Sequence, residues 1–217
     1  MQCPQCKAEI QDSSTFCTKC GASVTAQPPQ AGTAASQDFG ALFTNATNIW
    51  KENLGDLVLL TLVFMLIFWI PIANAGFIAG YYRSILKVLR KQGKAQVGDL
   101  FNAWDCFGNL LGYLVIIIVA SYILSKIPFI GFLGSWALSI AVTPGLYAII
   151  DKGSNLIDGF KWSFETLQKD PLNWVLACIV GGALAGVGAI ALLVGMIVTL
   201  SWGTLITASQ YELRKAD

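Results

Sequence analysis

The amino-acid sequence predicts an all-α membrane protein with about six transmembrane helices arranged as three hairpins, interfacial amphipathic helices and a small N-terminal zinc ribbon with four cysteine ligands. Three observations support this fold class. Of the 217 residues, 55% are hydrophobic and only 12% are charged, whereas charged residues make up about a quarter of an ordinary soluble domain. The stretch from Pro171 to Tyr211 contains no Asp, Glu, Lys or Arg. Two Cys-x-x-Cys pairs lie within the first 21 residues.

The cysteine pairs predict a metal site. Cys3 and Cys6 form the first pair, and Cys17 and Cys20 form the second, ten residues further on. Two such pairs present four thiolates in a tetrahedron, which is the arrangement that structural Zn²⁺ requires. Two disulfides in an exported segment and an iron site of the rubredoxin type remain as alternatives. Four cysteines leave no open metal position for water, so we expect no catalysis at this site.

The same residues carry a family resemblance. Cys3-Pro4-x-Cys6 together with Phe16-Cys17-x-x-Cys20-Gly21 resembles the short zinc-ribbon module that begins many bacterial and archaeal membrane proteins of unknown function. The resemblance implies one structural zinc ion bound by Cys3, Cys6, Cys17 and Cys20. It departs from the usual pattern at Lys7, where such ribbons commonly have glycine. We expect the ribbon to occupy residues 1–23 and a flexible Ala-, Pro- and Gln-rich linker to occupy residues 24–37.

Uncharged runs within residues 38–213 predict the membrane spans. A single helix of the 41 residues Pro171–Tyr211 would be about 60 Å long, twice the ~30 Å hydrocarbon core, so this stretch must fold back. The glycines of Ala185–Gly188 favour the reversal there. With the other runs, this gives spans at Leu54–Ile70, Gly76–Arg90, Phe107–Ser125, Ile127–Ile150, Leu172–Leu184 and Ala189–Ser209.

Basic residues predict the orientation. Arg83, Lys87, Arg90, Lys91 and Lys94 form the largest basic cluster, and such clusters favour the cytoplasmic side. Zinc thiolates also favour a reducing compartment. With six spans, both termini are then cytoplasmic, and the resemblance places the chain in a prokaryotic inner membrane.

The similarity of the three hairpins predicts internal repeats at about residues 39–94, 97–152 and 155–213. Each repeat begins with an amphipathic segment, at Phe39–Trp50, Gly98–Trp104 and Leu156–Leu167, which we expect at the membrane interface. A polar residue then opens each hairpin: Asp56, Asn109 and Asn173. These residues are candidates for a polar intramembrane site, together with Arg83. Alternatively, water or neighbouring amides satisfy the three residues at the membrane edge, and the Arg83 charge reaches the interface on its long side chain.

Glycines four residues apart predict close helix packing. The pairs are Gly76 and Gly80, Gly108 and Gly112, and Gly182 and Gly186. Such spacing lets helix backbones approach each other, either within one bundle, which we favour, or across a dimer interface. We interpret Cys106 and Cys178, which lie far from the ribbon in sequence, as unreactive packing residues.

The sequence predicts a non-enzymatic protein. It has no histidine and none of the nucleophile, phosphate-loop or paired-carboxylate motifs. We do not expect nucleic acid as a partner, because Glu9 and Asp12 offset Lys7 and Lys19, the only basic residues of the ribbon. We favour a membrane adaptor that displays the ribbon in the cytoplasm to a protein partner, with homo-oligomerisation left open. The alternative is a small transporter, channel or lipid-handling protein with the ribbon as a regulatory module.

The membrane half also resembles, loosely, uncharacterised bacterial integral membrane families built from an amphipathic segment and a hairpin. The resemblance covers about residues 38–213 and includes the element Pro144-Gly145-Leu146-Tyr147. It implies an accessory or transport-related role in the membrane and names no ligand.

Overall fold

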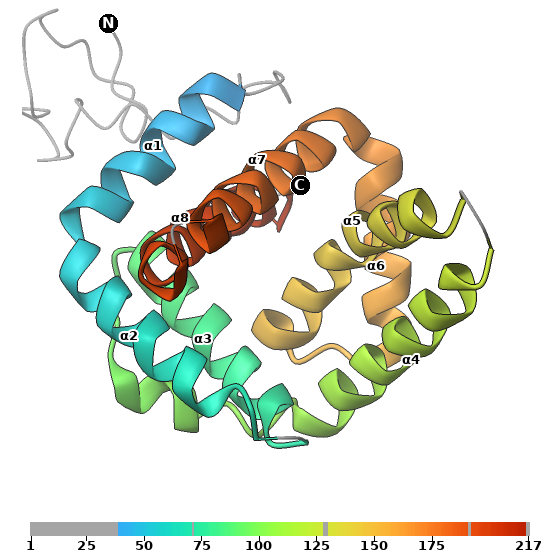
Figure 1. The fold of residues 1–217 in the computed structure, drawn as a ribbon, viewed down its shortest axis with the longest axis horizontal. Coiled ribbons are helices and arrows are strands. Elements are labelled where there is room, and N and C mark those ends of the chain that lie inside the picture. Colours follow the sequence, from blue (N-terminus) through green and yellow to red (C-terminus); the bar gives the residue numbers. More distant parts are fainter. Residues whose placement is uncertain (1–38, 71, 128–129, 191, 216–217) are drawn as a thin grey trace, which may run out of the picture. The chain divides into compact units, whose positions relative to one another are not determined.

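The computed structural model describes residues 39–70, 72–127, 130–190 and 192–215. The predicted ribbon and linker therefore lie outside the described residues. The described part is entirely helical, without strands, as the sequence predicted. Its elements, shown in Figure 1, are α1 (Phe39–Glu52), α2 (Leu54–Ile67), α3 (Asn74–Leu89), the 3₁₀ helix η1 (Val97–Phe101), α4 (Phe107–Ser125), α5 (Ile130–Lys152), α6 (Leu156–Lys169), α7 (Pro171–Ile190) and α8 (Leu192–Lys215).

Two long hairpins form much of the described unit. In Figure 1, α4 runs beside α5, and α7 lies against α8. The third predicted hairpin, α2 with α3, is also present, and α3 additionally contacts α8, η1, α4 and α5. The predicted reversal at Ala185–Gly188 is wrong, because α7 continues to Ile190. In this helix Gly188 allows close contact with α8 and does not form a turn, since a Cβ atom at this position would overlap Gly195 and Thr199.

Three described helical segments are long and apolar enough to cross a membrane: Phe107–Ser125, Leu133–Lys152 and Pro171–Gly188. The predicted six spans are therefore not found in the described chain. α2 has 14 residues and a length of about 21 Å, which is short of the ~30 Å core. α3 has 16 residues and carries Arg83 and Lys87. α8 is longer, but Ser, Thr and Gln side chains interrupt its apolar sequence.

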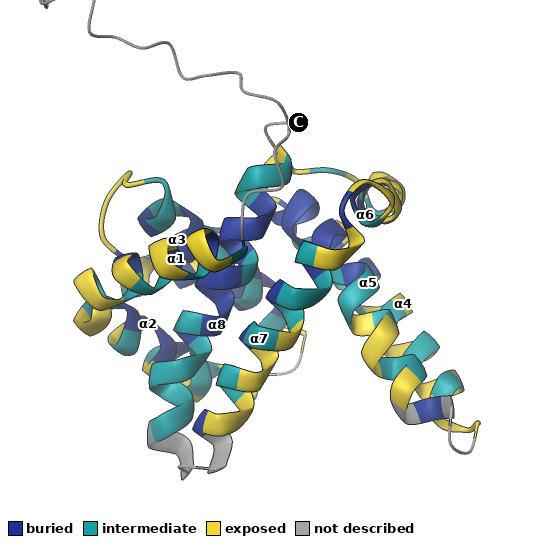
Figure 2. Ribbon diagram, turned by 90° about the horizontal axis from the view of Figure 1, so that it is seen from above, coloured by how far each residue is buried: buried dark blue, intermediate teal, exposed yellow. Residues whose placement is uncertain are grey.

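Burial distinguishes the outer and inner faces of this unit. Exposed residues lie along α4 and one side of α7 in Figure 2; for example, Ile118 on α4 is 65% exposed. Such an apolar outer face suits contact with lipid. The amphipathic helix α1 instead packs on α8, where the rings of Trp50 and Trp202 stack with centroids 5.0 Å apart. The Trp202 indole also donates a hydrogen bond to Thr47 Oγ1 at 3.0 Å.

A proline in α5 sets the packing around that helix. Pro144 has no backbone N–H, so the carbonyl of Ile140 loses its donor within the helix. The Trp174 indole of α7 donates to this carbonyl at 3.3 Å. Next to the proline, the Gly145 amide donates to Ser163 Oγ of α6 at 2.7 Å, and the Tyr113 hydroxyl of α4 donates to the Val142 carbonyl at 2.7 Å. Three neighbouring helices therefore satisfy the backbone around this proline.

The predicted glycine pairs have different environments. Gly80 lies against the backbone of Asp99 and Leu100, and Gly76 lies against the Trp104 ring, so this pair packs within the chain as expected. A Cβ atom on Gly112 would meet only the end of the Leu156 side chain. No described atom lies within 4 Å of the Cβ position of Gly108, Gly182 or Gly186. The tightest backbone approaches instead involve Gly145 with Gly159 and Gly181 with Gly203.

We expect Gly145→Ala to lower the free energy of unfolding by about 2 kcal/mol, because overpacking a tight contact typically costs 1–3 kcal/mol. The new methyl group would overlap the Gly159 carbonyl and lie 2.5 Å from Tyr113 Oη. Thermal unfolding in one detergent measures the effect. Gly186→Ala is the control, since its Cβ meets open space and alanine favours helix by up to about 1 kcal/mol. Equal midpoints for the two variants would contradict the contact.

Candidate functional site

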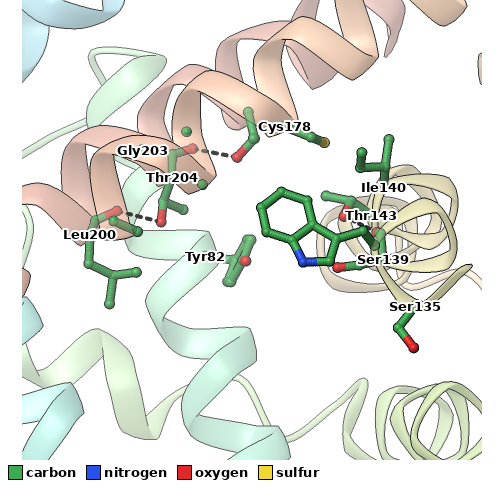
Figure 3. Close-up of a pocket in the computed structure, with 14 residues that line it drawn as sticks. Tyr82, Ser135, Ser139, Ile140, Thr143, Cys178, Leu200, Gly203 and Thr204 are labelled. Atoms are coloured by element: carbon green, nitrogen blue, oxygen red, sulfur yellow. Dashed lines mark hydrogen bonds between the residues drawn. The ribbon is translucent and has the colours of Figure 1, made fainter. Parts of the chain in front are cut away.

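The first of two neighbouring cavities lies between α5, α7 and α8 and has a volume of about 360 Å³. Hydroxyl groups dominate its polar lining, so we call it the hydroxyl chamber; Figure 3 shows its wall. Tyr82 of α3 contributes to this wall beside the α5 and α8 side chains Ser135, Ser139, Thr143, Thr204 and Thr207.

The second cavity is larger, about 680 Å³, and lies among α2, α3, α4, α5 and α8. Leucine, isoleucine, methionine and aromatic side chains make most of its wall, so we call it the apolar chamber. Tyr82, Leu200 and Thr204 line both chambers, which therefore adjoin at these residues. No Asp, Glu, Lys or Arg is among the described residues that line either one.

The hydroxyl groups of the chamber differ in their hydrogen bonding. Thr143 Oγ1 donates to the Ser139 carbonyl at 2.7 Å, and Thr204 Oγ1 donates to the Leu200 carbonyl at 2.8 Å, as Figure 3 shows. Hydroxyls bonded in this way keep lone pairs that can accept a hydrogen bond. The hydroxyls of Tyr82 and Ser139 have no hydrogen-bond partner within the described part of the chain. They are free to bind a ligand.

A series of tyrosine rings joins the chambers to the charged residues at one end of the bundle. The Tyr82 and Tyr147 rings meet edge to face with centroids 5.0 Å apart. The Tyr147 ring stacks on Tyr211 at 5.1 Å, and the Tyr211 hydroxyl donates to Asp151 Oδ2 at 2.8 Å. Along this series two tyrosine rings, those of Tyr147 and Tyr211, lie between Tyr82 in the chamber wall and the carboxylate of Asp151.

Charged side chains gather where α3, α5 and α8 end, and we call this region the charged end. Arg90 donates to Asp151 Oδ1 at 2.7 Å and to Glu212 Oε1 from Nε at 3.0 Å. Lys215 lies 2.6 Å from Asp151. These ion pairs tie three helices together at their C-termini.

The charged end also contains one of the predicted polar residues. Arg83 makes a bidentate pair with Asp105, at 2.5 and 2.7 Å, and donates to the Ile150 carbonyl at 2.8 Å. The guanidinium of Arg83 holds the pKa of Asp105 below its usual value. Arg83 therefore fixes the loop before α4 to the end of α5.

The other three predicted polar residues are not brought together into one site. Asp56 is partly exposed and lies 3.8 Å from Lys94, Asn109 is exposed on the first turn of α4, and Asn173 donates to Asp170. Neither these three residues nor Arg83 lines either chamber.

The sequence analysis did not predict the residues that line the chambers. A signal was present, because Ser135, Ser139 and Thr143 recur every four residues in an apolar span and so share one helix face. Cys178, predicted to be packing, lines the hydroxyl chamber, whereas Cys106 is 2% exposed.

Asp170 is the buried carboxylate that fixes the start of α7. It pairs with Arg214, accepts from the Asn173 side-chain amide at 3.2 Å and accepts from Gln210 at 3.1 Å. Burial opposes ionisation of Asp170, but the hydrogen bonds from Arg214 and Asn173 outweigh it, so its pKa lies below the usual value. The ionised carboxylate therefore stabilises the folded chain.

Comparison with known proteins identifies one domain. Residues 2–24 match the zinc-ribbon domain family, so the chain has a zinc ribbon at its N-terminus. Domains of this type in general bind zinc, and the four thiolates of this one suit a tetrahedral Zn²⁺ site. No curated protein and no solved structure matches the chain.

We expect Asp170→Asn to lower the free energy of unfolding at pH 7 by about 3 kcal/mol, because it removes the buried carboxylate to which Arg214 donates. Stability from the ionised carboxylate is present above about pH 4, the ordinary pKa of Asp, and is lost as the pH falls through the lower folded-state pKa. Thermal unfolding measured from pH 7 to acid should therefore fall less steeply for the variant than for wild type.

The matched control is Asp56→Asn. The Asp56–Lys94 pair is exposed and 3.8 Å apart, so its loss should cost at most about 1 kcal/mol. Similar losses at pH 7 for the two variants would show that Asp170 has no special role at the start of α7.

Proposed function

We propose that the protein is a non-enzymatic integral membrane protein that binds a lipid-like ligand in the two adjoining chambers. The single observation that carries this proposal is a pair of cavities, one with several hydroxyl-bearing side chains in its wall and one with a mainly apolar wall, that adjoin at Tyr82, Leu200 and Thr204. Their volumes, about 360 and 680 Å³, lie within the range of small-molecule sites. The apolar spans of α4, α5 and α7 place such a site within reach of membrane lipid.

The zinc ribbon then serves as a regulatory module outside the membrane. We place the ribbon, the charged end and both termini on the cytoplasmic side, because basic residues concentrate at the charged end and thiolates are stable in a reducing compartment. The threefold repeat stays a prediction within the same proposal.

A leucine at Gly182 should block ligand binding. Gly182 lines the hydroxyl chamber, and no described atom lies within 4 Å of its Cβ position, so a larger side chain fits the fold and occupies part of the chamber. We expect wild type purified in mild detergent to retain lipid, and Gly182→Leu to retain less by at least about fivefold, which is a loss of only ~1 kcal/mol. Mass spectrometry of lipid extracted per mole of protein measures this retention.

Gly186→Leu is the matched control. Gly186 lies one turn further along α7, also faces open space, and lines neither chamber. Both variants make the same change in helix propensity and surface hydrophobicity. If the two retained equal amounts of lipid, the chambers would not be the binding site.

We propose a membrane adaptor as the second candidate function, and its starting point is the zinc ribbon at residues 2–24. A ribbon with four cysteine ligands has no open coordination position, so recognition of a protein partner suits it better than chemistry. A tether of about 14 residues would keep its partner concentrated near the bilayer.

We expect the double variant Cys17→Ser, Cys20→Ser to lose the zinc of the ribbon, because two of four ligands are removed. Metal analysis should give one zinc per wild-type chain and almost none for the variant, with unchanged thermal unfolding of the helical unit. The proteins that co-purify with wild type and with the variant from solubilised membranes are then compared. An adaptor requires that a protein captured by wild type is absent with the variant, and identical captures would exclude that function.

A further inference from the structure

We propose that the ligand is an uncharged single-chain amphiphile whose hydroxylated headgroup lies in the hydroxyl chamber and whose hydrocarbon chain lies in the apolar chamber. Tyr82, at the junction of the two, binds the headgroup through its hydroxyl. This inference rests on the proposed function, for which it names the chemical class of the ligand and a residue that recognises it.

The absence of charge in the chamber walls selects an uncharged headgroup. Neither chamber is lined by a described acidic or basic side chain, and the effective cost of burying an unpaired ion is several kcal/mol. The nearest ionic groups along the tyrosine series are already paired, since Asp151 binds Arg90 and Lys215. A phosphate or carboxylate in the hydroxyl chamber would therefore have no counter-ion.

The hydroxyls select a headgroup that both donates and accepts hydrogen bonds. Ser139 and Tyr82 offer unpartnered hydroxyls within the described chain, and the helix-bonded hydroxyls of Thr143 and Thr204 keep free lone pairs. A pure hydrocarbon would leave these groups unsatisfied, at a cost of about 1–3 kcal/mol for each buried one. An alcohol or glyceryl headgroup would satisfy them.

The position of Tyr82 fixes the orientation of the ligand. Its ring lies between Tyr81, at 6.1 Å, and Tyr147, at 5.0 Å between centroids, so the aromatic neighbours restrict its motion. Leu200 and Thr204 complete the junction, with one apolar and one polar side chain. Phe68 and Trp69, just after α2, also line the apolar chamber, and their rings suit contact with an acyl chain.

The experiment measures binding of tritium-labelled 1-monooleoylglycerol to the purified full-length protein in maltoside micelles. Unlabelled monooleoylglycerol should compete, whereas oleate at pH 9, which is ionised, and octadecene, which has no headgroup, should compete at least about tenfold more weakly, the factor that 1.4 kcal/mol produces. Tyr82→Phe should weaken binding by about fivefold, the effect of one net hydrogen bond. Ser139→Ala should weaken it in the same direction.

Tyr122→Phe is the matched control, because Tyr122 is 63% exposed on α4 and lies outside both chambers. Unchanged thermal unfolding of Tyr82→Phe would show that its fold is intact, and Ser139→Ala tests the same headgroup site independently. The ligand class would be overturned if oleate or octadecene competed as well as monooleoylglycerol, or if both Tyr82→Phe and Ser139→Ala bound with wild-type affinity. In either case, a loss of lipid retention in Gly182→Leu would still support the proposed function. If the amphiphile does not bind and Gly182→Leu matches Gly186→Leu in lipid retention, the proposed function falls as well.

Discussion

The described structure depends on the backbone constraint that Pro144 imposes on α5. A helix in an apolar environment has no water to satisfy a free carbonyl, so the partner lost at Ile140 must come from another helix. Trp174 supplies it from α7, while Tyr113 and Ser163 bond the adjacent turn from α4 and α6. The backbone around Pro144 is therefore bonded to all three neighbouring helices. The hydroxyl-bearing residues Ser135, Ser139 and Thr143 of the same helix line the hydroxyl chamber beside residues of α7 and α8.

Polar groups in the described chain are separated into two kinds of environment. Ionised groups pair with one another at the charged end, where Arg90 joins α3 to α5 and α8. Neutral hydroxyls line the chamber between the helices, and tyrosine rings separate the two regions. The separation has a physical basis. A buried ion is stable only where a counter-ion or water is close, whereas a Ser or Thr hydroxyl in a helix can donate a hydrogen bond to a backbone carbonyl of the preceding turn. The hydroxyl chamber thus has polar groups in its wall without a charged side chain among its described lining residues.

Local patterns predicted much of the fold, and contacts between distant segments were not predicted. Periodicity and composition gave the all-helical class, the helical segments α1 and α6, and the extent of α4 to the residue. Cysteine spacing predicted the ribbon that the family match supports.

The predicted position of the reversal between α7 and α8 was wrong, because glycine favours a turn in water but close packing between membrane helices. Asp105, the partner of Arg83, lies 22 residues away along the chain, and no helix periodicity predicts such a pair. The hydroxyl chamber forms only where α3, α5, α7 and α8 meet, and the apolar chamber where α2, α3, α4, α5 and α8 meet, so patterns within single segments identified none of their residues as a site.

The crossing of α7 and α8 at Gly181 and Gly203 has a mechanical consequence. Each glycine lies against the backbone of the other, with no room for a side chain between them. A side chain at either position would push α7 and α8 apart at this crossing. Because both glycines also line the hydroxyl chamber, the width of the chamber between these two helices depends on the absence of a side chain at each position.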